Sequence, residues 1–382
     1  MMVAYKLYYA TNRNHIGADR WQPQSYGTKF SDDGMENLRF GVVTVNADED
    51  RVRKHLDADV KDSGTGNGEA LSGYLKTCAE SARIDAFEEH IKKEIAESAQ
   101  PDAKLGSKAM FDELQTAMFN SSDVLIYIHG FNVSWRDAVG AALALQLMLQ
   151  NSPARDPEQG LLVVLFTWPS DGLALPWVSY KSDRSEAIGS GAAVGRAFLK
   201  ARDFLAALRD RAKNAGQQLC RQDIHLLCHS MGNFLLQHAL ARMAEHTPGS
   251  ALPRLFEQVF LCAPDVDDNA LEAGQPLGQV HEIARSVSVY HNHGDTAMTV
   301  SDYTKGNPER LGGYGAAHPA LLHSKIHQID CTPIVHGIAE HSYYLTGKVN
   351  ADIRESIDGW SQDDGRRRRA RKSHLTNVWM ME

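Results

Sequence analysis

Residues 223–234 read Asp-Ile-His-Leu-Leu-Cys-His-Ser-Met-Gly-Asn-Phe. An apolar strand pattern leads directly into Cys228-His229-Ser230-Met231-Gly232, and a helical pattern follows it. A sharp strand-to-helix turn lifts a serine hydroxyl out of the backbone and leaves the next N–H free to bind an oxyanion. The usual form is Gly-x-Ser-x-Gly, and Cys228 stands here in place of the first glycine. The stretch therefore predicts Ser230 as a nucleophile and the Met231 N–H as one donor of an oxyanion hole.

Short apolar strands alternate with helical patterns on both sides of this turn. Strands are predicted over residues 124–128, 161–166, 224–228, 259–262, 287–290 and 326–329, with helical patterns between most of them. Because these strands are apolar on both faces, they indicate a sheet that is covered by helices on both sides. We therefore expect an α/β fold with a mostly parallel central sheet flanked by helices, and its catalytic core over residues 121–360.

The two ends of the chain differ from this core. Residues 1–49 are predicted to add N-terminal strands to it, since 3–10 and 38–45 are rich in β-branched and aromatic residues. Residues 361–382 contain the run Arg366-Arg367-Arg368-Arg369-Ala370-Arg371-Lys372. A compact run of like charge usually belongs to a solvated segment, so a basic, flexible tail is expected there.

Residues 50–120 are predicted to form a helical insertion or lid near the N-terminus. Apolar residues recur at helical spacing over 70–99, and a second helix is expected over 108–119.

The bulk composition narrows the class of protein. The chain has 382 residues, 43% of them hydrophobic, and a net charge of −8, which fits a globular protein without a nucleic-acid partner. Its five cysteines are scattered and odd in number, which favours buried thiols in a reducing compartment. The sequence shows neither a signal peptide nor an apolar stretch of about 20 residues. We expect a cytoplasmic protein without a membrane span, and a homo-oligomer is left open.

A serine nucleophile needs a base to take its proton and an acid to orient that base. Asp295 and His341 each follow a later strand, in the chain order Ser, Asp, His that such sheets use. Asp265 and Asp267 follow the preceding strand and remain alternative acids. The alternative bases are His336, His327 and His323.

The loop after the strand at 124–128 is predicted to complete the site. It reads His129-Gly130-Phe131-Asn132, and the Phe131 N–H is the first choice for the second oxyanion donor, with Asn132 next. Asn132, Trp168 and Tyr180 are predicted to line the substrate pocket. For the two aromatic residues, packing in the core is the alternative.

Two further patterns are given structural rather than chemical interpretations. His291-x-His293-x-Asp295 begins like a metal-ligand motif, but the next residue is Thr296, so no metal is predicted. Gly189-x-Gly191-x-x-x-Gly195 lacks the spacing of a dinucleotide loop and is interpreted as helix packing.

Taken together, these motifs resemble those of α/β-hydrolases of the serine esterase and lipase type, and most of all a bacterial family long catalogued as a domain of unknown function. The matching segments lie within about residues 120–346: Ile128-His129-Gly130-Phe131-Asn132, Phe166-Thr167-Trp168-Pro169-Ser170, Tyr180 with Asp183, Cys228-His229-Ser230-Met231-Gly232-Asn233, Ala263-Pro264-Asp265-Val266-Asp267 and His341-Ser342-Tyr343.

The resemblance implies an α/β-hydrolase fold with Ser230 as nucleophile, Asp295 as acid and His341 as base, and no cofactor. It implies hydrolysis of a small-molecule carboxylic ester through an acyl-enzyme. A lipase, thioesterase, amidase or acyltransferase with the same triad, and a non-catalytic relative that binds a partner, are also compatible with these motifs.

Overall fold

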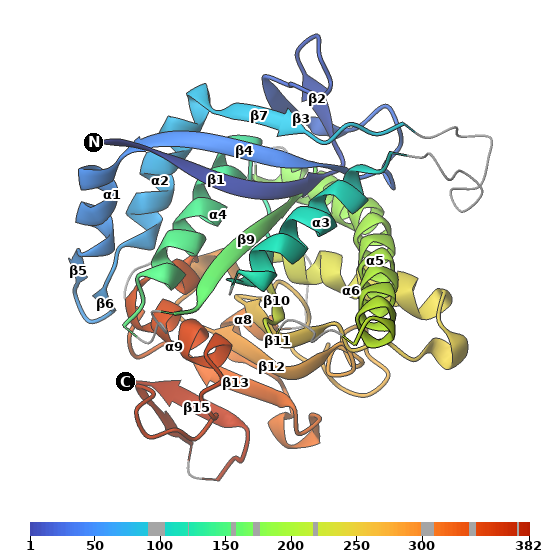
Figure 1. The fold of residues 1–382 in the computed structure, drawn as a ribbon. Coiled ribbons are helices and arrows are strands. Elements are labelled where there is room, and N and C mark those ends of the chain that lie inside the picture. Colours follow the sequence, from blue (N-terminus) through green and yellow to red (C-terminus); the bar gives the residue numbers. More distant parts are fainter. Residues whose placement is uncertain are drawn as a thin grey trace.

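The computed structural model describes residues 1–90, 104–120, 122–153, 158–170, 176–216, 221–298, 309–335, 341–372 and 374–382. Among these residues, eleven strands form one sheet in the order β14-β15-β13-β12-β11-β10-β8-β9-β1-β4-β7 (Figure 1). The strands that the site uses are β8 (Ser122–Ile128), β9 (Gly160–Thr167), β10 (Ile224–His229), β11 (Phe256–Cys262), β12 (Ala284–His291) and β13 (Ile326–Asp330). Each of these six strands pairs in parallel with its neighbours in this set.

Strands from the two ends of the chain extend this parallel centre. β1 (Met2–Thr11) pairs in parallel with β9, and β4 (Arg39–Asp48) pairs antiparallel with β1. At the opposite edge, β15 (Val378–Met381) pairs in parallel with β13 and antiparallel with β14 (Arg369–Arg371). The small two-stranded sheets are β2 (Arg13–Ile16) with β3 (Ser25–Phe30), and β5 (Asp59–Val60) with β6 (Gly64–Thr65).

Helices cover both faces of the sheet, as the apolar strands require. One face packs against α1 (Glu49–Leu56), α2 (Gly68–Cys78), α4 (Trp135–Gln150) and α9 (Gly347–Ile357). The other face packs against α3 (Gly106–Phe119), α5 (Pro176–Asn214) and α6 (Met231–Glu245) (Figure 1). Alternate residues of β10 serve the two cores, Leu227 on the α4 side and Leu226 on the α6 side. The predicted α/β class with a mostly parallel sheet is therefore confirmed.

The packing of α5 against α6 explains Gly191 and Gly195, two of the three glycines that resemble a dinucleotide motif, whereas Gly189 faces Phe30 and Met35. A Cβ atom on Gly191 would lie 2.5 Å from His238 Cβ, so only glycine allows the two helices to approach this closely. The interpretation as helix packing is confirmed for Gly191 and Gly195.

Residues 50–120 differ from the expected helical insertion or lid. The helix predicted over 70–99 ends at Cys78, and β7 (Arg83–Ala86) then joins the main sheet beside β4. Ile84 and Ala86 are buried while their neighbours are more exposed, so the segment follows the two-residue period of a strand. The helix predicted over 108–119 is present as α3, and it packs on β4 and β8 as part of the covering layer. Residues 91–103 lie outside the described residues.

The basic run is also not a flexible tail. Arg367 and Arg369 are buried and Arg366 and Arg368 are exposed, and β14 begins only at Arg369. Asp352 of α9 accepts hydrogen bonds from Arg367 Nε at 2.9 Å and from Arg369 Nη1 at 3.1 Å. These contacts tie the C-terminal strands to the body of the protein.

Candidate active site

Ser230 lies in the turn between β10 and α6 with backbone angles φ 51° and ψ −123°. A non-glycine residue adopts positive φ only at a cost, so this turn is a strained one. At Ser230 the backbone turns away from the direction of β10, and α6 begins at the next residue, Met231. N–H groups in the first turn of a helix have no acceptor within that helix, and they carry its positive dipole end.

The Asn233 side chain holds this turn in shape. Its amide Nδ2 lies 3.1 Å from the Cys228 carbonyl and 3.0 Å from the Ser230 carbonyl, and Asn233 is fully buried. The Ser230 N–H donates in turn to the Cys262 carbonyl of β11 at 3.0 Å. A side chain in the first turn of α6 thus braces the strained residue from within.

Cys228, which stands where a glycine is usual, is a packing residue. It is fully buried, and burial raises the pKa of its thiol, so the sulfur stays protonated and does not compete as a nucleophile.

Gly130 allows the loop after β8 to approach Ser230 closely. A Cβ on Gly130 would lie 2.7 Å from Ser230 Cβ, so a larger residue would displace the nucleophile.

His341 and Asp295 are brought together beside this turn. His341 Nδ1 donates to Asp295 Oδ2 at 2.7 Å. The Asp295 side chain is 1% exposed and that of His341 is 22% exposed, so the acid is enclosed while the imidazole remains accessible. Asp295 is fixed further by the Ala297 N–H, which donates to its other oxygen at 3.0 Å.

His229, the neighbour of Ser230, supports the loop that carries His341. Its Nε2 donates to the His341 carbonyl at 3.1 Å, and the two rings lie 4.6 Å apart between centroids. Burial and the adjacent His341 ring hold the pKa of His229 well below its ordinary value of 6.5, so it is neutral. Tyr343 anchors the same segment, because its hydroxyl donates to the Tyr290 carbonyl at 2.9 Å. The imidazole of His341 is thereby fixed next to the serine turn.

The alternative acids have different partners. Asp265 accepts a hydrogen bond from the Tyr180 hydroxyl at 2.7 Å, and its second oxygen lies 3.6 Å from Arg310 Nε. Asp267 forms an ion pair with the same arginine.

Two of the alternative bases also have partners other than the serine turn. His327 packs its ring against Trp379 of β15, and the exposed His323 stacks on His281. His336 lies outside the described residues.

The loop after β8 takes its shape from buried polar contacts. Asn132 has φ 59°, and its backbone N–H donates to Asp183 Oδ2 at 3.2 Å. Asp183, which is fully buried on α5, also accepts from the Ser170 hydroxyl at 2.5 Å. Because the Asn132 N–H is already engaged, the arrangement favours Phe131 over Asn132 as an oxyanion donor. The Asn132 side chain is exposed, and the half-buried Phe131 ring meets Tyr180 edge-on at 5.5 Å.

Arg13 links this loop to the one after β9. Its guanidinium donates to the Val133 carbonyl at 2.7 Å and to the Thr167 hydroxyl at 2.8 Å. That hydroxyl also lies 2.9 Å from His129 Nε2. Burial and the charge of Arg13 lower the pKa of His129 to about 3, so His129 is neutral and shapes the loop rather than acting as a base.

Trp168 is not a pocket residue, which corrects the prediction made from its position after β9. Its side chain is 0% exposed, stacks on the His129 ring and donates from Nε1 to the His129 carbonyl at 3.1 Å. Trp168 therefore supports the loop that begins at His129 from the interior of the protein. Tyr180 is also largely buried, with its hydroxyl on Asp265.

The side chains of the His291-x-His293-x-Asp295 pattern are not directed toward one common position. Asp295 contacts His341, whereas the His293 ring packs edge-on against Tyr314 at 5.0 Å. Within the described part of the chain, no three His, Cys, Asp or Glu side chains are grouped closely enough to hold a metal ion. Nor does any helix in that part combine the length and apolar composition needed to cross a membrane.

Comparison with known families agrees with this geometry. A model of the family described as alpha/beta hydrolase of unknown function (DUF900) matches residues 107–350, more than half of the chain. The chain belongs to this family. Searches of curated proteins and of solved structures gave no match.

For several residues that shape the site of this alpha/beta hydrolase, the sequence did not predict a supporting role. Asn233, His229 and Asp183 lie inside the family match, whereas Arg13 lies well before it. Asn233 carries one available signal, since an amide in the first turn of a helix often bonds to nearby backbone. No local pattern marks Arg13, because Val133 and Thr167, its partners at the site, are more than 100 positions away in the chain.

Proposed function

We propose that this alpha/beta hydrolase cleaves carboxylic esters through an acyl-enzyme, with Ser230 as nucleophile, His341 as base and Asp295 as acid. The observation that carries the proposal is the 2.7 Å hydrogen bond from His341 Nδ1 to Asp295, beside a serine held at positive φ in a strand-to-helix turn. A carboxylate on Nδ1 leaves Nε2 unprotonated, which is the form of imidazole that can accept the serine proton.

In the first half of the reaction, His341 Nε2 takes the Ser230 proton while Oγ attacks the acyl carbon. Asp295 stabilises the imidazolium that forms, and the N–H groups of Met231 and Phe131 donate to the oxyanion. The tetrahedral intermediate then collapses, the bond to the alcohol oxygen breaks, and His341 gives its proton to that oxygen.

The second half repeats these roles with water. His341 takes a proton from a water molecule, the resulting hydroxide attacks the acyl carbon, and Ser230 leaves with the proton returned from the imidazole. A carboxylic acid is released and the free enzyme is restored.

The test is labelling by a fluorophosphonate, which reacts with an activated serine. Wild-type protein is expected to be labelled and to hydrolyse nitrophenyl esters, and Ser230→Ala is expected to lose both properties. Ser288→Ala is the matched control, since Ser288 is a buried serine whose hydroxyl has no hydrogen-bond partner among the described residues.

A wild-type protein that is folded but unlabelled would contradict the proposal and favour a non-catalytic binding protein. A series of nitrophenyl esters of increasing acyl length separates a short-chain esterase from a lipase. Matched thioesters and amides measure thioesterase and amidase activity, and an added alcohol acceptor measures acyl transfer.

A further inference from the structure

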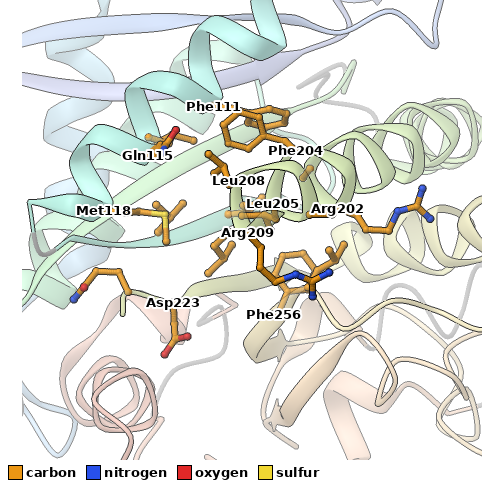
Figure 2. Close-up of a pocket in the computed structure, with 18 of the residues that line it drawn as sticks. Phe111, Gln115, Met118, Arg202, Phe204, Leu205, Leu208, Arg209, Asp223 and Phe256 are labelled. Carbon is orange, nitrogen blue, oxygen red and sulfur yellow. The ribbon is translucent and has the colours of Figure 1, made fainter. Parts of the chain in front are cut away.

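A pocket with a volume of about 790 Å³ lies between α3 and α5 (Figure 2). Its sheet residues include Val124 near the start of β8 and Ile224 at the start of β10. Ser230 follows the opposite end of β10, so the strand length of roughly 20 Å, at about 3.3 Å per residue, separates the pocket from the serine. The pocket is therefore not part of the candidate active site.

The interior of this pocket is apolar. Met110, Leu114 and Met118 of α3 form one wall, and Leu205 and Leu208 of α5 form the facing wall. The strands form the floor. The rings of Phe111 and Phe204 meet at 5.1 Å at one end of the slot (Figure 2). A volume of about 300–1,000 Å³ is typical of small-molecule sites. An apolar slot that reaches the sheet can enclose an extended alkyl chain, which a flat surface cannot do.

The charged residues that line the pocket are mainly arginines. They are Arg202, Arg209, Arg211 and Arg254, against the carboxylates of Asp223 and Glu257. Glu257 is paired with Arg285 at 2.8 Å, which offsets its charge. Arg211 and Arg254 are exposed and form no ion pair with any of the described residues. An anion beside them would complete the charge balance of the pocket.

We propose that this pocket binds a long-chain carboxylate, with its alkyl chain between α3 and α5 and its head group at Arg211 and Arg254. Burial of methylene groups against Met110, Leu114 and Leu208 favours the chain, at about 0.8 kcal/mol per CH₂. The planar guanidinium matches the two oxygens of a carboxylate, which favours that head group over a neutral or cationic one. The site is independent of the esterase activity proposed above.

Calorimetric titration of the full-length protein with dodecanoate, below its micelle concentration, tests the site. Saturable binding with a stoichiometry of one is expected. Dodecanol and dodecyltrimethylammonium are expected to bind at least tenfold more weakly than dodecanoate.

Three variants locate the ligand. Leu208→Glu and the double variant Arg211→Glu/Arg254→Glu are expected to raise the Kd at least tenfold. Lys213→Glu reverses a charge on the same helix outside the pocket and is expected to leave the Kd unchanged. All three are expected to keep wild-type hydrolysis of nitrophenyl acetate, so the two proposals are measured in separate assays.

The proposal is overturned if dodecanoate does not bind, if the cationic amphiphile binds equally well, or if binding survives in both pocket variants. Thermal unfolding of each variant identifies loss of binding caused by misfolding. Because Arg211 and Arg254 are exposed, their double variant still reports on the site if Leu208→Glu fails to fold.

Discussion

At the scale of single residues, one hydrogen bond distinguishes the three carboxylates that follow β11 and β12. Asp295 contacts His341, whereas Asp265 and Asp267 contact Arg310. Residue order cannot separate them, because all three follow strands at the same edge of the sheet. The difference arises from which loop reaches the imidazole, and that is a property of the folded chain.

Replacement of Asp295 is expected to lower kcat far more than replacement of Asp267. Asp295→Asn is expected to lower kcat by about 10⁴-fold, since an amide cannot stabilise the imidazolium and permits the wrong tautomer. Asp267→Asn, at a half-exposed carboxylate, is expected to change kcat by less than tenfold. The measurement is steady-state hydrolysis of a nitrophenyl ester, with thermal unfolding as the check on folding. If Asp267→Asn, or the corresponding Asp265→Asn, loses more activity than Asp295→Asn, the assignment of the acid is wrong.

The serine, the acid and the base can all be proposed from sequence because each follows a strand with a recognisable apolar pattern. Their supports cannot. Arg13 and Asp183 act on the loop after β8 across long stretches of chain. Asp183 falls in a segment that carries the family resemblance, but nothing near either residue in sequence indicates its contact with that loop. The pocket prediction for Trp168 is wrong because the sequence gives its distance from a strand end but not the direction of its side chain.

At the scale of elements, the C-terminal arginine run and the segment that contains β7 depart furthest from the prediction. A run of arginines conceals its own two-residue period, since inward and outward positions carry the same residue type. Burial nevertheless alternates from Arg366 to Arg369, mostly before β14 begins, and Asp352 supplies the buried partner of Arg367 and Arg369. The prediction for the segment with β7 fails for a related reason, because a four-residue strand is too short to interrupt a helical pattern in the sequence.

Neighbouring arginines in that run offer a matched comparison. Arg367→Ala is expected to lower the free energy of unfolding by about 3–5 kcal/mol, because it leaves the buried carboxylate of Asp352 with one fewer cation. Arg366→Ala is expected to leave stability nearly unchanged, since Arg366 is exposed and bonds to Asp364 near the surface. Urea unfolding of the two variants checks this. Equal losses would show that the C-terminal strands are not held as described.

At the scale of the whole molecule, several histidines are buried in their neutral form. Burial lowers the pKa of His129 to about 3 and that of His291 to about 4, and it holds the pKa of His229 well below its usual range. In the unfolded chain each returns to about 6.5. The unfolded state therefore binds more protons below pH 6.5, and stability falls as the pH is lowered.

Each such histidine is expected to remove about 2 kcal/mol of unfolding free energy between about pH 8 and pH 5. His291→Gln is expected to reduce the loss of unfolding free energy by about 2 kcal/mol, because it removes one buried histidine. His15→Gln, at an exposed position, is expected to leave the loss unchanged. Urea unfolding at both pH values measures the effect. If His291→Gln loses as much stability as wild-type protein between these two pH values, the His291 ring is not held neutral in the folded state.

The placement of β1 has a consequence for how the protein is made. This strand leaves the ribosome well before its parallel partner β9, which is synthesised some 150 residues later. Until then the β1–β4 ribbon presents an unpaired apolar edge, which is a template for pairing with other nascent chains. We expect newly made chains to depend on chaperones until β9 has emerged, and recombinant yield to improve when translation is slowed by low temperature.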